Sequence, residues 1–378
     1  MTTDPTTIDI PRSMLPSDGR FGCGPSKIRA EQALALAKAN SNLLGSSHRQ
    51  PPVKNLVGEI RAGLTELFSL PDGWEILLGN GGTTMFWDAA TFGLVAERSQ
   101  HYVFGEFSAK FFEASANAPH LEFPMEVRGD FGSHPPLVAA EEDVDAIALT
   151  HNETSTGVAM ELRRPAGGNN ALVLVDATSA AGGLPWSPGD TDVYYFAPQK
   201  CFASDGGLWL AACSPAAIQR IESIKASGRW TPASLDLKIA LDNSRLNQTY
   251  NTPALGTLVL LHEQLTWMLD NGGLAWCAAR CRMSSRYLYE WAEASTYASP
   301  FVKDPAQRSA VVGTIDLDES VRADDVCAAL RANGVVDTDS YRKLGRNQLR
   351  IGMFPAVEPE DVVRLTGCID YVVGSLAA

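Results

Sequence analysis

The sequence predicts an α/β protein whose mostly parallel sheet is sandwiched by helices, with a smaller C-terminal α+β domain. Short apolar runs without polar alternation, typical of parallel strands buried on both faces, alternate with amphipathic helical segments. The chain also has 378 residues, more than the roughly 250–300 at which one hydrophobic core usually stops growing. Two domains in one chain are therefore expected.

The first two thirds of the chain contain the elements of the sheet. Helices are expected over 26–40 and 54–70, the second because its apolar residues recur with a period near 3.6. A strand over 75–79 then leads through a glycine-rich turn into a helix over 85–95. Further strands are expected over 102–104, 144–150, 172–176, 193–196 and 208–212, with helices over 108–114 and 215–226. Ligands of such sheets bind at the carboxyl ends of the strands.

The composition changes near Asn271-Gly272-Gly273. The elements expected beyond this point are helices over 276–293, 321–333 and 360–373, and strands over 311–316 and 348–353. We therefore expect an N-terminal segment over 1–20, a large domain over 21–265 and a small domain over 266–378.

The charge and the cysteine content limit which classes of partner and which cellular compartment are expected. The chain has 31 Lys and Arg against 44 Asp and Glu, a net charge of −13, which argues against nucleic acid or an anionic membrane as the main partner. The seven cysteines are scattered without the spacing of a zinc site, so no metal is expected. The N-terminus lacks the pattern of a signal peptide, and no apolar run approaches the ~18 residues of a membrane span. The expectation is a cytoplasmic protein that binds small anions through local cations.

Lys200 follows the expected strand over 193–196 and the turn Ala197-Pro198-Gln199. Taken alone, a lysine after a strand is usually a solvated surface charge. Here apolar residues precede it and Gly206-Gly207-Leu208-Trp209 follow, which places Lys200 at a sheet edge among buried elements. Burial lowers the pKa of a lysine, and the free amine can form a Schiff base with a carbonyl group.

Asp176 closes the apolar run Leu172-Val173-Leu174-Val175. A carboxylate at the end of a buried strand is expected to face a cation. A protonated pyridine nitrogen is such a cation, and an aspartate beside it keeps pyridoxal phosphate an effective electron sink. A helix N-cap is the alternative role for this residue.

The segment Gly81-Gly82-Thr83-Thr84 lies between a strand and a helix. Glycines at this place let backbone N–H groups approach an anion at the positive end of the helix, and threonine hydroxyls add donors. The segment has neither the Walker lysine pattern nor a G-x-G-x-x-G fingerprint. A phosphate site and a simple tight turn both fit it.

Short motifs are distributed in a fixed order along nearly the whole chain. They are Phe21-Gly22-Cys23-Gly24-Pro25-Ser26, Ser47-His48-Arg49, Gly81-Gly82, His151-Asn152-Glu153-Thr154, Asp176-Ala177-Thr178-Ser179, Ala197-Pro198-Gln199-Lys200, Tyr250-Asn251-Thr252-Pro253 and Arg346-Asn347-Gln348-Leu349-Arg350. In this order the sequence resembles the pyridoxal-phosphate enzymes of the class V aminotransferase family and, within it, the phosphoserine aminotransferases. The resemblance implies the type I fold of pyridoxal-phosphate-dependent transferases. It also implies reversible amino transfer between O-phospho-L-serine and 2-oxoglutarate in serine biosynthesis, with a phosphohydroxythreonine of pyridoxine biosynthesis as a second substrate.

The resemblance also implies roles for residues around the cofactor. Lys200 would hold pyridoxal phosphate covalently and then act as general base, and Asp176 would pair with the pyridine nitrogen. Phe107 would stack on the pyridine ring, where the family often has a tryptophan, and Thr154 would donate to the phenolic oxygen. The residues implied to hold the cofactor phosphate are Gly82, Thr83, Thr84 and Gln199. Those implied to reach the cofactor phosphate of the neighbouring subunit of a homodimer are Asn251 and Thr252.

The implied amino-acid and 2-oxo-acid substrates each carry two anionic groups. Arg350 would bind the α-carboxylate, for which a guanidinium offers two donors. His48 and Arg49 would bind the substrate phosphate or the distal carboxylate, supplemented by Arg342.

Two positions depart from the pattern of many family members. Thr83 stands where an arginine is common, and Tyr341 where the first residue of a His-Arg pair is common. Arg342, Arg346 or Lys27 would compensate for the missing cations.

Alternatives from the same and from other classes remain open. A glyoxylate aminotransferase would need no second cationic site, and a cysteine desulfurase would need a cysteine in a flexible loop, which is not evident. A dehydrogenase built on the same strand–loop–helix unit would bind nicotinamide and form no Schiff base. A non-enzymatic interaction module is disfavoured because the polar residues follow strand ends.

Overall fold

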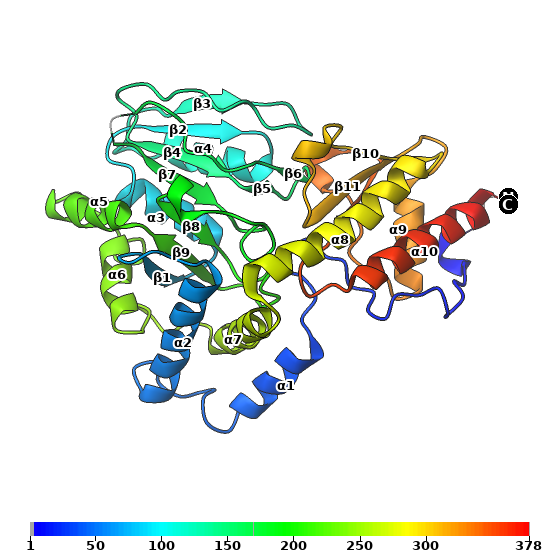
Figure 1. Ribbon diagram of the computed structural model, residues 1–378, viewed down its shortest axis with the longest axis horizontal. Coiled ribbons are helices and arrows are strands. Elements are labelled where there is room, and N and C mark those ends of the chain that lie inside the picture. Colours follow the sequence, from blue (N-terminus) through cyan, green and yellow to red (C-terminus); the bar gives the residue numbers. More distant parts are fainter. Residues whose placement is uncertain (1–3, 169, 378) are drawn as a thin grey trace.

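The computed structural model describes residues 4–168 and 170–377, and these form two lobes joined by a long helix (Figure 1). The larger lobe contains a seven-stranded sheet. In sheet order its strands are β1 (Glu75–Asn80), β9 (Leu208–Cys213), β8 (Val193–Phe196), β7 (Leu172–Asp176), β4 (Ala146–Thr150), β2 (Ser99–Val103) and β3 (Met125–Arg128). Only β9 is antiparallel to its neighbours. The carboxyl ends of the other six strands therefore lie at one edge of the sheet.

Helices cover both faces of this sheet. On one face lie α2 (Pro51–Leu67) and α7 (Leu255–Asp270), with α1 (Ala30–Ala39) packed on α7. On the other face lie α3 (Thr83–Gly93), α4 (Glu106–Ala116), α5 (Pro215–Ala226) and α6 (Leu237–Arg245). Neighbouring strand residues such as Ile76 and Leu77 belong to opposite cores, because side chains alternate across a strand. The expected sandwich of a mostly parallel sheet between helices is confirmed.

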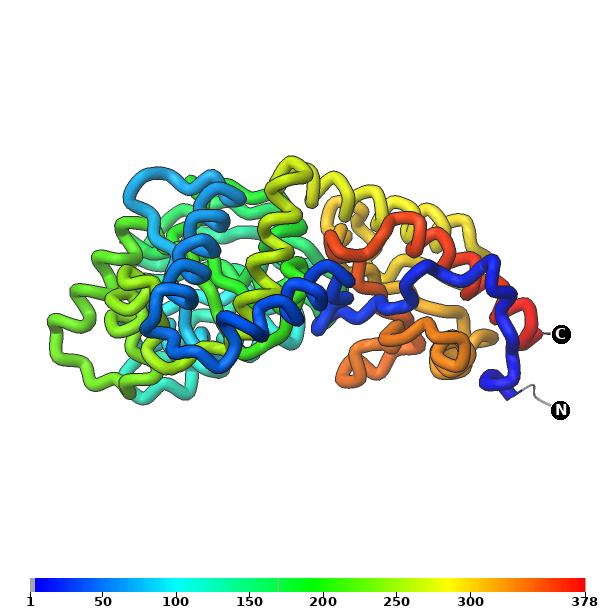
Figure 2. Tube along the Cα trace, turned by 90° about the horizontal axis from the view of Figure 1, so that it is seen from below, coloured from blue at the N-terminus to red at the C-terminus, as the bar shows by residue number. Residues whose placement is uncertain are grey.

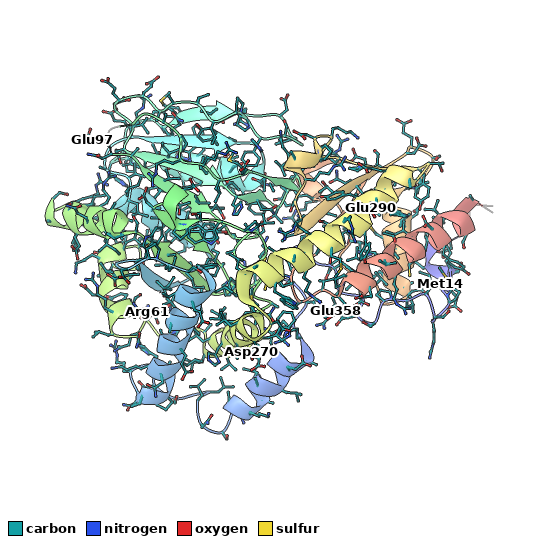
Figure 3. All side chains as sticks on the ribbon, viewed as in Figure 1. Met14, Arg61, Glu97, Asp270, Glu290 and Glu358 are labelled. Atoms are coloured by element: carbon teal, nitrogen blue, oxygen red, sulfur yellow. The ribbon has the colours of Figure 1, made fainter. Side chains whose placement is uncertain are left out.

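Side chains fill the space between sheet and helices (Figure 3). Arg61, labelled on α2, donates from Nε to the Ile76 carbonyl of β1 at 2.9 Å and from Nη1 to Asn247 Oδ1 at 2.7 Å. These bonds connect α2, β1 and the segment that follows α6.

The smaller lobe contains a three-stranded antiparallel sheet. Its strands are β10 (Ala298–Pro300), β11 (Val312–Leu317) and β12 (Gln348–Gly352), and its helices are α8 (Gly273–Ala294), α9 (Ala323–Ala332) and α10 (Pro359–Ala377). Helix α8 connects the lobes, since Cys277 and Cys281 pack in the core of the large lobe and Leu288 in that of the small lobe. The remaining elements are β5 (Asn152–Glu153), β6 (Val158–Ala159), η1 (Pro5–Thr7), η2 (Pro188–Asp190), η3 (Pro305–Gln307) and η4 (Arg342–Leu344).

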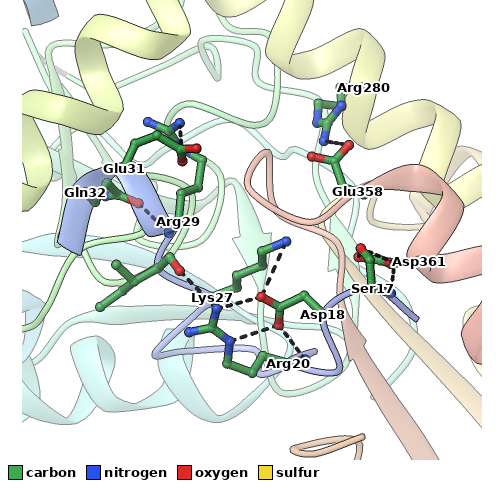
Figure 4. A network of polar contacts seen from close by, with 11 residues as sticks. Ser17, Asp18, Arg20, Lys27, Arg29, Glu31, Gln32, Arg280, Glu358 and Asp361 are labelled. Atoms are coloured by element: carbon green, nitrogen blue, oxygen red, sulfur yellow. Dashed lines mark hydrogen bonds and ion pairs between the residues drawn. The ribbon is translucent and has the colours of Figure 1, made fainter. Parts of the chain in front are cut away.

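The N-terminal segment runs along the small lobe before it reaches α1 (Figure 2). Ser17 donates its backbone N–H to Asp361 Oδ1 of α10 at 2.6 Å, and Arg29 donates from Nε to Gln264 Oε1 of α7 at 2.7 Å. Figure 4 shows Ser17, Asp361 and Arg29. It also shows Lys27, whose Nζ lies 3.7 Å from Asp18 Oδ2. The segment thus bridges the two lobes.

The elements expected from the sequence occur, with shifted ends. The helix expected over 26–40 begins at Ala30, because Ser26 is used elsewhere: its N–H donates to the Gln199 carbonyl at 2.9 Å and its hydroxyl to the Lys200 carbonyl at 2.6 Å. The helix expected over 54–70 begins earlier, at Pro51, where two prolines occupy the first turn. Helix α7 was not expected, since Leu258, Val259, Leu260 and Leu261 are all buried and leave no one-sided apolar pattern.

The division into domains stays a prediction, and the packing bears on its boundaries. The expected boundary between residues 265 and 266 falls inside α7. In the N-terminal segment, Ile8 and Ile10 pack in the core of the small lobe. We infer that the small domain begins at the connection between α7 and α8 and includes the N-terminal segment. In the described ranges, no helix has the length and apolar character needed to cross a bilayer.

Candidate functional site

A cavity of about 250 Å³ lies at the edge of the large sheet where the parallel strands end. The turns that follow β1, β2, β4, β7 and β8 all contribute to its lining. The lining residues are Gly24, Gly82, Thr83, Thr84, Trp87, Phe107, Thr150, Asn152, Thr154, Asp176, Thr178, Gln199 and Lys200. Eight residues predicted for the site from the sequence therefore meet in one cavity, which we call the Lys200 cavity.

Lys200 is 7% exposed. Its Nζ donates to Thr154 Oγ1 at 3.3 Å and lies 5.5 Å from the centre of the Phe107 ring. A Cβ atom on Gly24, whose φ is +128°, would lie 2.5 Å from Lys200 Cε, so only glycine leaves room for the lysine chain. Burial lowers the pKa of Lys200 to about 8. A substantial fraction of the amine is therefore free near neutral pH.

Asp176 lies at the carboxyl end of β7 and is 5% exposed. Its Oδ2 accepts from Trp87 Nε1 at 3.1 Å, and its Oδ1 accepts from the Thr178 N–H at 2.9 Å. The two hydrogen bonds lower the pKa of Asp176, but burial raises it by more, so the net shift is upward. No lysine or arginine of the described residues lies within 4.0 Å of this carboxylate. Its environment therefore favours a ligand that supplies a positive charge.

The N-terminus of α3 opens into the same cavity. Gly81 has a φ of +105°, and Gly82 is an N-cap without a side-chain bond to the first turn. A Cβ on Gly82 would meet no atom within 4 Å. Thr83 Oγ1 lies 2.7 Å from Thr178 Oγ1, and Gln199 Oε1 is buried without a hydrogen-bond partner among the described residues. Free N–H groups at a helix N-terminus together with hydroxyl and amide groups form a site for an anion.

Phe107 is the second residue of α4, and its position is set by Glu153. The fully buried Glu153 carboxylate accepts at Oε2 from the N–H groups of Phe107 at 3.1 Å and Ser108 at 2.9 Å, and at Oε1 from the Ser155 hydroxyl at 2.7 Å. A buried carboxylate on the N-terminus of a helix stabilises that end. The aromatic wall of the cavity is thereby fixed to the strand end that carries Thr154.

The small lobe contributes Arg350, from β12. Its Nη1 donates to the Thr154 carbonyl at 3.3 Å, and its guanidinium carbon lies 5.2 Å from the centre of the Tyr341 ring. Its Nε is buried and has no hydrogen-bond partner in the described part of the chain. Arg350 therefore lies beside the cavity, and its Nε–H group is available to donate to a ligand.

Six of the predicted residues do not line the Lys200 cavity. Two of them are Arg350, described above, and Arg342, and the other four lie near one another. His48 Nδ1 and Thr252 Oγ1 are 3.2 Å apart, and Arg49 donates from Nη1 to Gln248 Oε1 at 3.3 Å. The Thr252 carbonyl accepts from Asn80 Nδ2, at the end of β1, at 2.9 Å. We call His48, Arg49, Asn251 and Thr252 the outer cluster. All but His48 are exposed.

The three cations expected to compensate for Thr83 and Tyr341 differ in whether they already form ion pairs. Arg346 pairs with Asp316 at 2.7 Å, and Lys27 lies 3.7 Å from a carboxylate oxygen of Asp18. Arg342 is exposed on η4. Arg346 and Lys27 are thus engaged in ion pairs, which leaves Arg342 as the better candidate.

Six residues of the site were not singled out from the sequence. They are Gly24, Trp87, Thr150, Asn152, Glu153 and Thr178. Asn152, Glu153 and Thr178 lie in motifs used for the resemblance, so their position beside Thr154 and Asp176 was a usable signal. Trp87 lies inside a helix, and nothing in its local sequence points to the carboxylate that it contacts.

Comparison with known proteins agrees with this geometry. The family described as aminotransferase class V matches residues 28–339. The chain is 59% identical over 376 residues to phosphoserine aminotransferase of Rhodococcus jostii and, equally, to that of Rhodococcus opacus, in each case over 100% of both chains.

Solved structures share the fold. A phosphoserine aminotransferase of Cytophaga hutchinsonii has a TM-score of 0.86 at 24% identity, over 93% of this chain and 99% of that one. An aspartate aminotransferase of subgroup IV from Thermus thermophilus has a TM-score of 0.79 at 21% identity, over 94% and 99%. The expected type I fold is confirmed. The matches extend over most of the chain, and the protein belongs to the class V aminotransferase family.

Proposed function

We propose that this protein catalyses reversible amino transfer between O-phospho-L-serine and 2-oxoglutarate with pyridoxal phosphate as cofactor. The products are 3-phosphohydroxypyruvate and L-glutamate. The observation that carries the proposal is the Lys200 cavity, in which a buried amine lies between a carboxylate without a cation and an open helix N-terminus. The relatives that match the whole chain at 59% identity are named for this activity.

The cavity fits the cofactor group by group. The pyridine nitrogen would supply the positive charge that Asp176 lacks, and the phosphate would take the N–H groups at the start of α3. Gln199 also lines the cavity, and its Nε2 group would donate to the phosphate, whereas its Oε1, buried without a partner in the described part of the chain, can only accept. The Phe107 ring supplies a face for stacking. The Thr154 hydroxyl accepts from Lys200 Nζ and donates to Ser179 Oγ at 2.9 Å, and it would redirect this proton to the phenolic oxygen.

The protein's own contribution to the reaction follows from this arrangement. Once bound, pyridoxal phosphate supplies an electron sink for the bond that breaks at the substrate α-carbon. Lys200 Nζ, with its pKa lowered to about 8, accepts and returns the proton, because a base works best when its pKa lies near the working pH. Thr154 holds Nζ in place, and Asp176 stabilises a proton on the pyridine nitrogen. These are the catalytic roles that we assign.

Substrate binding requires two anion sites. Arg350, with its unpartnered Nε, would bind the α-carboxylate. The second anionic group would be bound by His48 and Arg49, supplemented by Arg342. Burial and the neighbouring Arg49 lower the pKa of His48, so a neutral imidazole would donate a hydrogen bond to the phosphate.

We infer that the outer cluster acts on the site of a partner subunit in a homodimer. Within one chain none of its four residues lines the Lys200 cavity. His48 contacts Thr252 directly, so a dimer that brings Thr252 to a partner's cofactor brings His48 and Arg49 to the partner's substrate. Cytoplasmic location and use of a phosphohydroxythreonine remain predictions.

Two measurements test the proposed function. Borohydride reduction followed by peptide mapping should find a phosphopyridoxyl group on Lys200; its absence would exclude this class of enzyme and favour the dehydrogenase. Steady-state kinetics should show kcat/KM for phosphoserine far above that for serine or alanine. Comparable values without the phosphate would indicate a glyoxylate-type aminotransferase instead.

A further inference from the structure

Tyr341 lies where the two lobes meet beside the Lys200 cavity. Its ring centre is 6.0 Å from that of Phe107, on α4 of the large lobe. On its other side, the guanidinium carbon of Arg350, on β12 of the small lobe, lies 5.2 Å from the ring centre. Tyr341 thus contacts the aromatic wall of the cavity and the only arginine that adjoins Thr154 in the described residues.

These two contacts belong to a ring of contacts that links Tyr341, Arg350, Thr154, Lys200 and Phe107. Phe107 lies 5.5 Å from Lys200 Nζ, Nζ donates to Thr154 Oγ1, and the Thr154 carbonyl accepts from Arg350 Nη1. Tyr341 completes the path between Arg350 and Phe107. Two contacts therefore set the position of the Arg350 guanidinium relative to Lys200. They are the hydrogen bond to the Thr154 carbonyl and the contact with the Tyr341 ring.

The segment that carries Tyr341 is docked on the large lobe. Lys343 forms an ion pair with Glu106, the residue before Phe107, and the Leu344 N–H donates to the Tyr341 carbonyl at 2.9 Å. These contacts need no ligand. The ring is held in place before any substrate binds.

Arg350 retains the donors that a carboxylate requires. Nη1 is bonded to Thr154, whereas Nε is buried and without a partner in the described part of the chain. A carboxylate binds a guanidinium through two parallel N–H bonds, for which the edge formed by Nε and Nη2 is suited. A guanidinium attracted to an aromatic face and tethered through Nη1 keeps this edge oriented.

We propose that Tyr341 is a positioning residue whose ring holds the Arg350 guanidinium so that its Nε–Nη2 edge receives the α-carboxylate of every substrate. The proposal deepens the proposed function and rests on it only in requiring substrates with an α-carboxylate. Tyr341 occupies a position at which family members often have a basic residue, yet it adds no positive charge. Burial raises the pKa of its hydroxyl, so the side chain stays neutral and acts through its ring.

The test compares Tyr341→Leu, which removes the ring, with Tyr341→Phe, which keeps it. The leucine variant should raise KM for phosphoserine and for glutamate alike by about three- to tenfold, the range of a partly desolvated cation–π contact, with a smaller change in kcat. Calorimetric titration of the holoenzyme with maleate, a dicarboxylate without an amino group, should show the same loss of affinity. The phenylalanine variant should match the unmodified protein in both measurements.

Two controls separate positioning from general damage. Tyr371→Leu makes the same change on the surface of α10, where the tyrosine is 37% exposed, and should change neither KM nor the maleate affinity. In the Arg350→Lys background, Tyr341→Leu should add nothing further, because the two residues would act as one unit.

Three outcomes would overturn the proposal. They are equal losses for the leucine and phenylalanine variants, unchanged affinities in the leucine variant, or additive losses in the double variant. If unmodified protein turned over serine as well as phosphoserine, the proposed function would fail instead, and the ratios between Tyr341 variants, measured with serine, would still decide the role of this ring.

Discussion

The Lys200 cavity and the outer cluster differ in how completely one chain builds them. The cavity is closed by five strand ends of a single sheet, and its central lysine and aspartate are buried and hydrogen-bonded. The outer cluster is mostly exposed: His48 contacts Thr252, Arg49 donates to Gln248, and none of the four residues lines the Lys200 cavity. Lys200 and Asp176 thus lie together within one chain, whereas binding of the cofactor phosphate and of the second anionic group, on our proposal, also uses residues of a partner subunit.

The largest expected effect comes from Lys200→Ala. Removing the amine eliminates both the attachment of the cofactor and the base, and turnover should fall by at least about 10³-fold. Circular dichroism and thermal unfolding of the cofactor-free variant should remain close to the unmodified protein, because alanine fits the same backbone. Residual activity within about tenfold would place the reacting base elsewhere.

The second largest effect is expected from substitution of Asp176, which also lines the cavity. Asp176→Asn keeps the shape but removes the charge, and kcat should fall by about 10²–10³-fold, as for loss of a preorganised electrostatic group. Trp87→Phe is the matched variant, since it removes one hydrogen bond to the same carboxylate and should cost about tenfold or less. Equal losses would mean that packing, rather than charge, matters at Asp176.

Burial of Lys200 also predicts how stability changes with pH. Its pKa is lowered from 10.5 to about 8, so between these pH values the unfolded chain binds more protons than the folded one. The stability of the cofactor-free protein should therefore rise with pH across this window, by an amount on the order of 2–3 kcal/mol. Lys200→Met should be the more stable protein at pH 7 and lose this advantage by pH 10, as followed by denaturant unfolding. A pH-independent difference would contradict the lowered pKa.

The smallest effect tests the outer cluster directly. Homodimers of Lys200→Ala and of Arg49→Ala should each be impaired with phosphoserine. If Arg49 serves the partner's site, a mixed dimer has one intact site, and exchange of subunits should restore activity to about a quarter of the unmodified level. Restoration should fail if Arg49 acts within its own chain. Serine as substrate is the control, because Arg49→Ala should affect it little.

Much of the cavity could be predicted because its residues follow strand ends. Once 172–176 and 193–196 are assigned as parallel strands, Asp176 and the turn before Lys200 must lie at the same edge. Trp87 escapes this argument, because it reaches Asp176 from inside a helix. Glu153 does follow a strand end, but its partners are backbone N–H groups of α4, which no side-chain pattern reveals.

Contacts where the two lobes meet could likewise not be predicted from the sequence. Arg350 could be assigned to the α-carboxylate by resemblance alone, and Arg346 seemed an equal candidate for the phosphate. The structure pairs Arg346 with Asp316 and places Tyr341 against Arg350. These pairings join the segment around η4 to strands β11 and β12, and sequence spacing does not encode them.

The sequence by itself determined most of the strands and helices, the polar residues at the strand ends and hence the class of chemistry, since these depend on local patterns of burial and turn. Only the tertiary structure decided which cations are free, which residues orient Lys200 and Arg350, and that the outer cluster lies apart from the cavity. The physical reason is that a charge or a hydrogen-bond donor is defined by its neighbours in space, and those neighbours can lie 196 residues away along the chain, as Arg350 lies from Thr154.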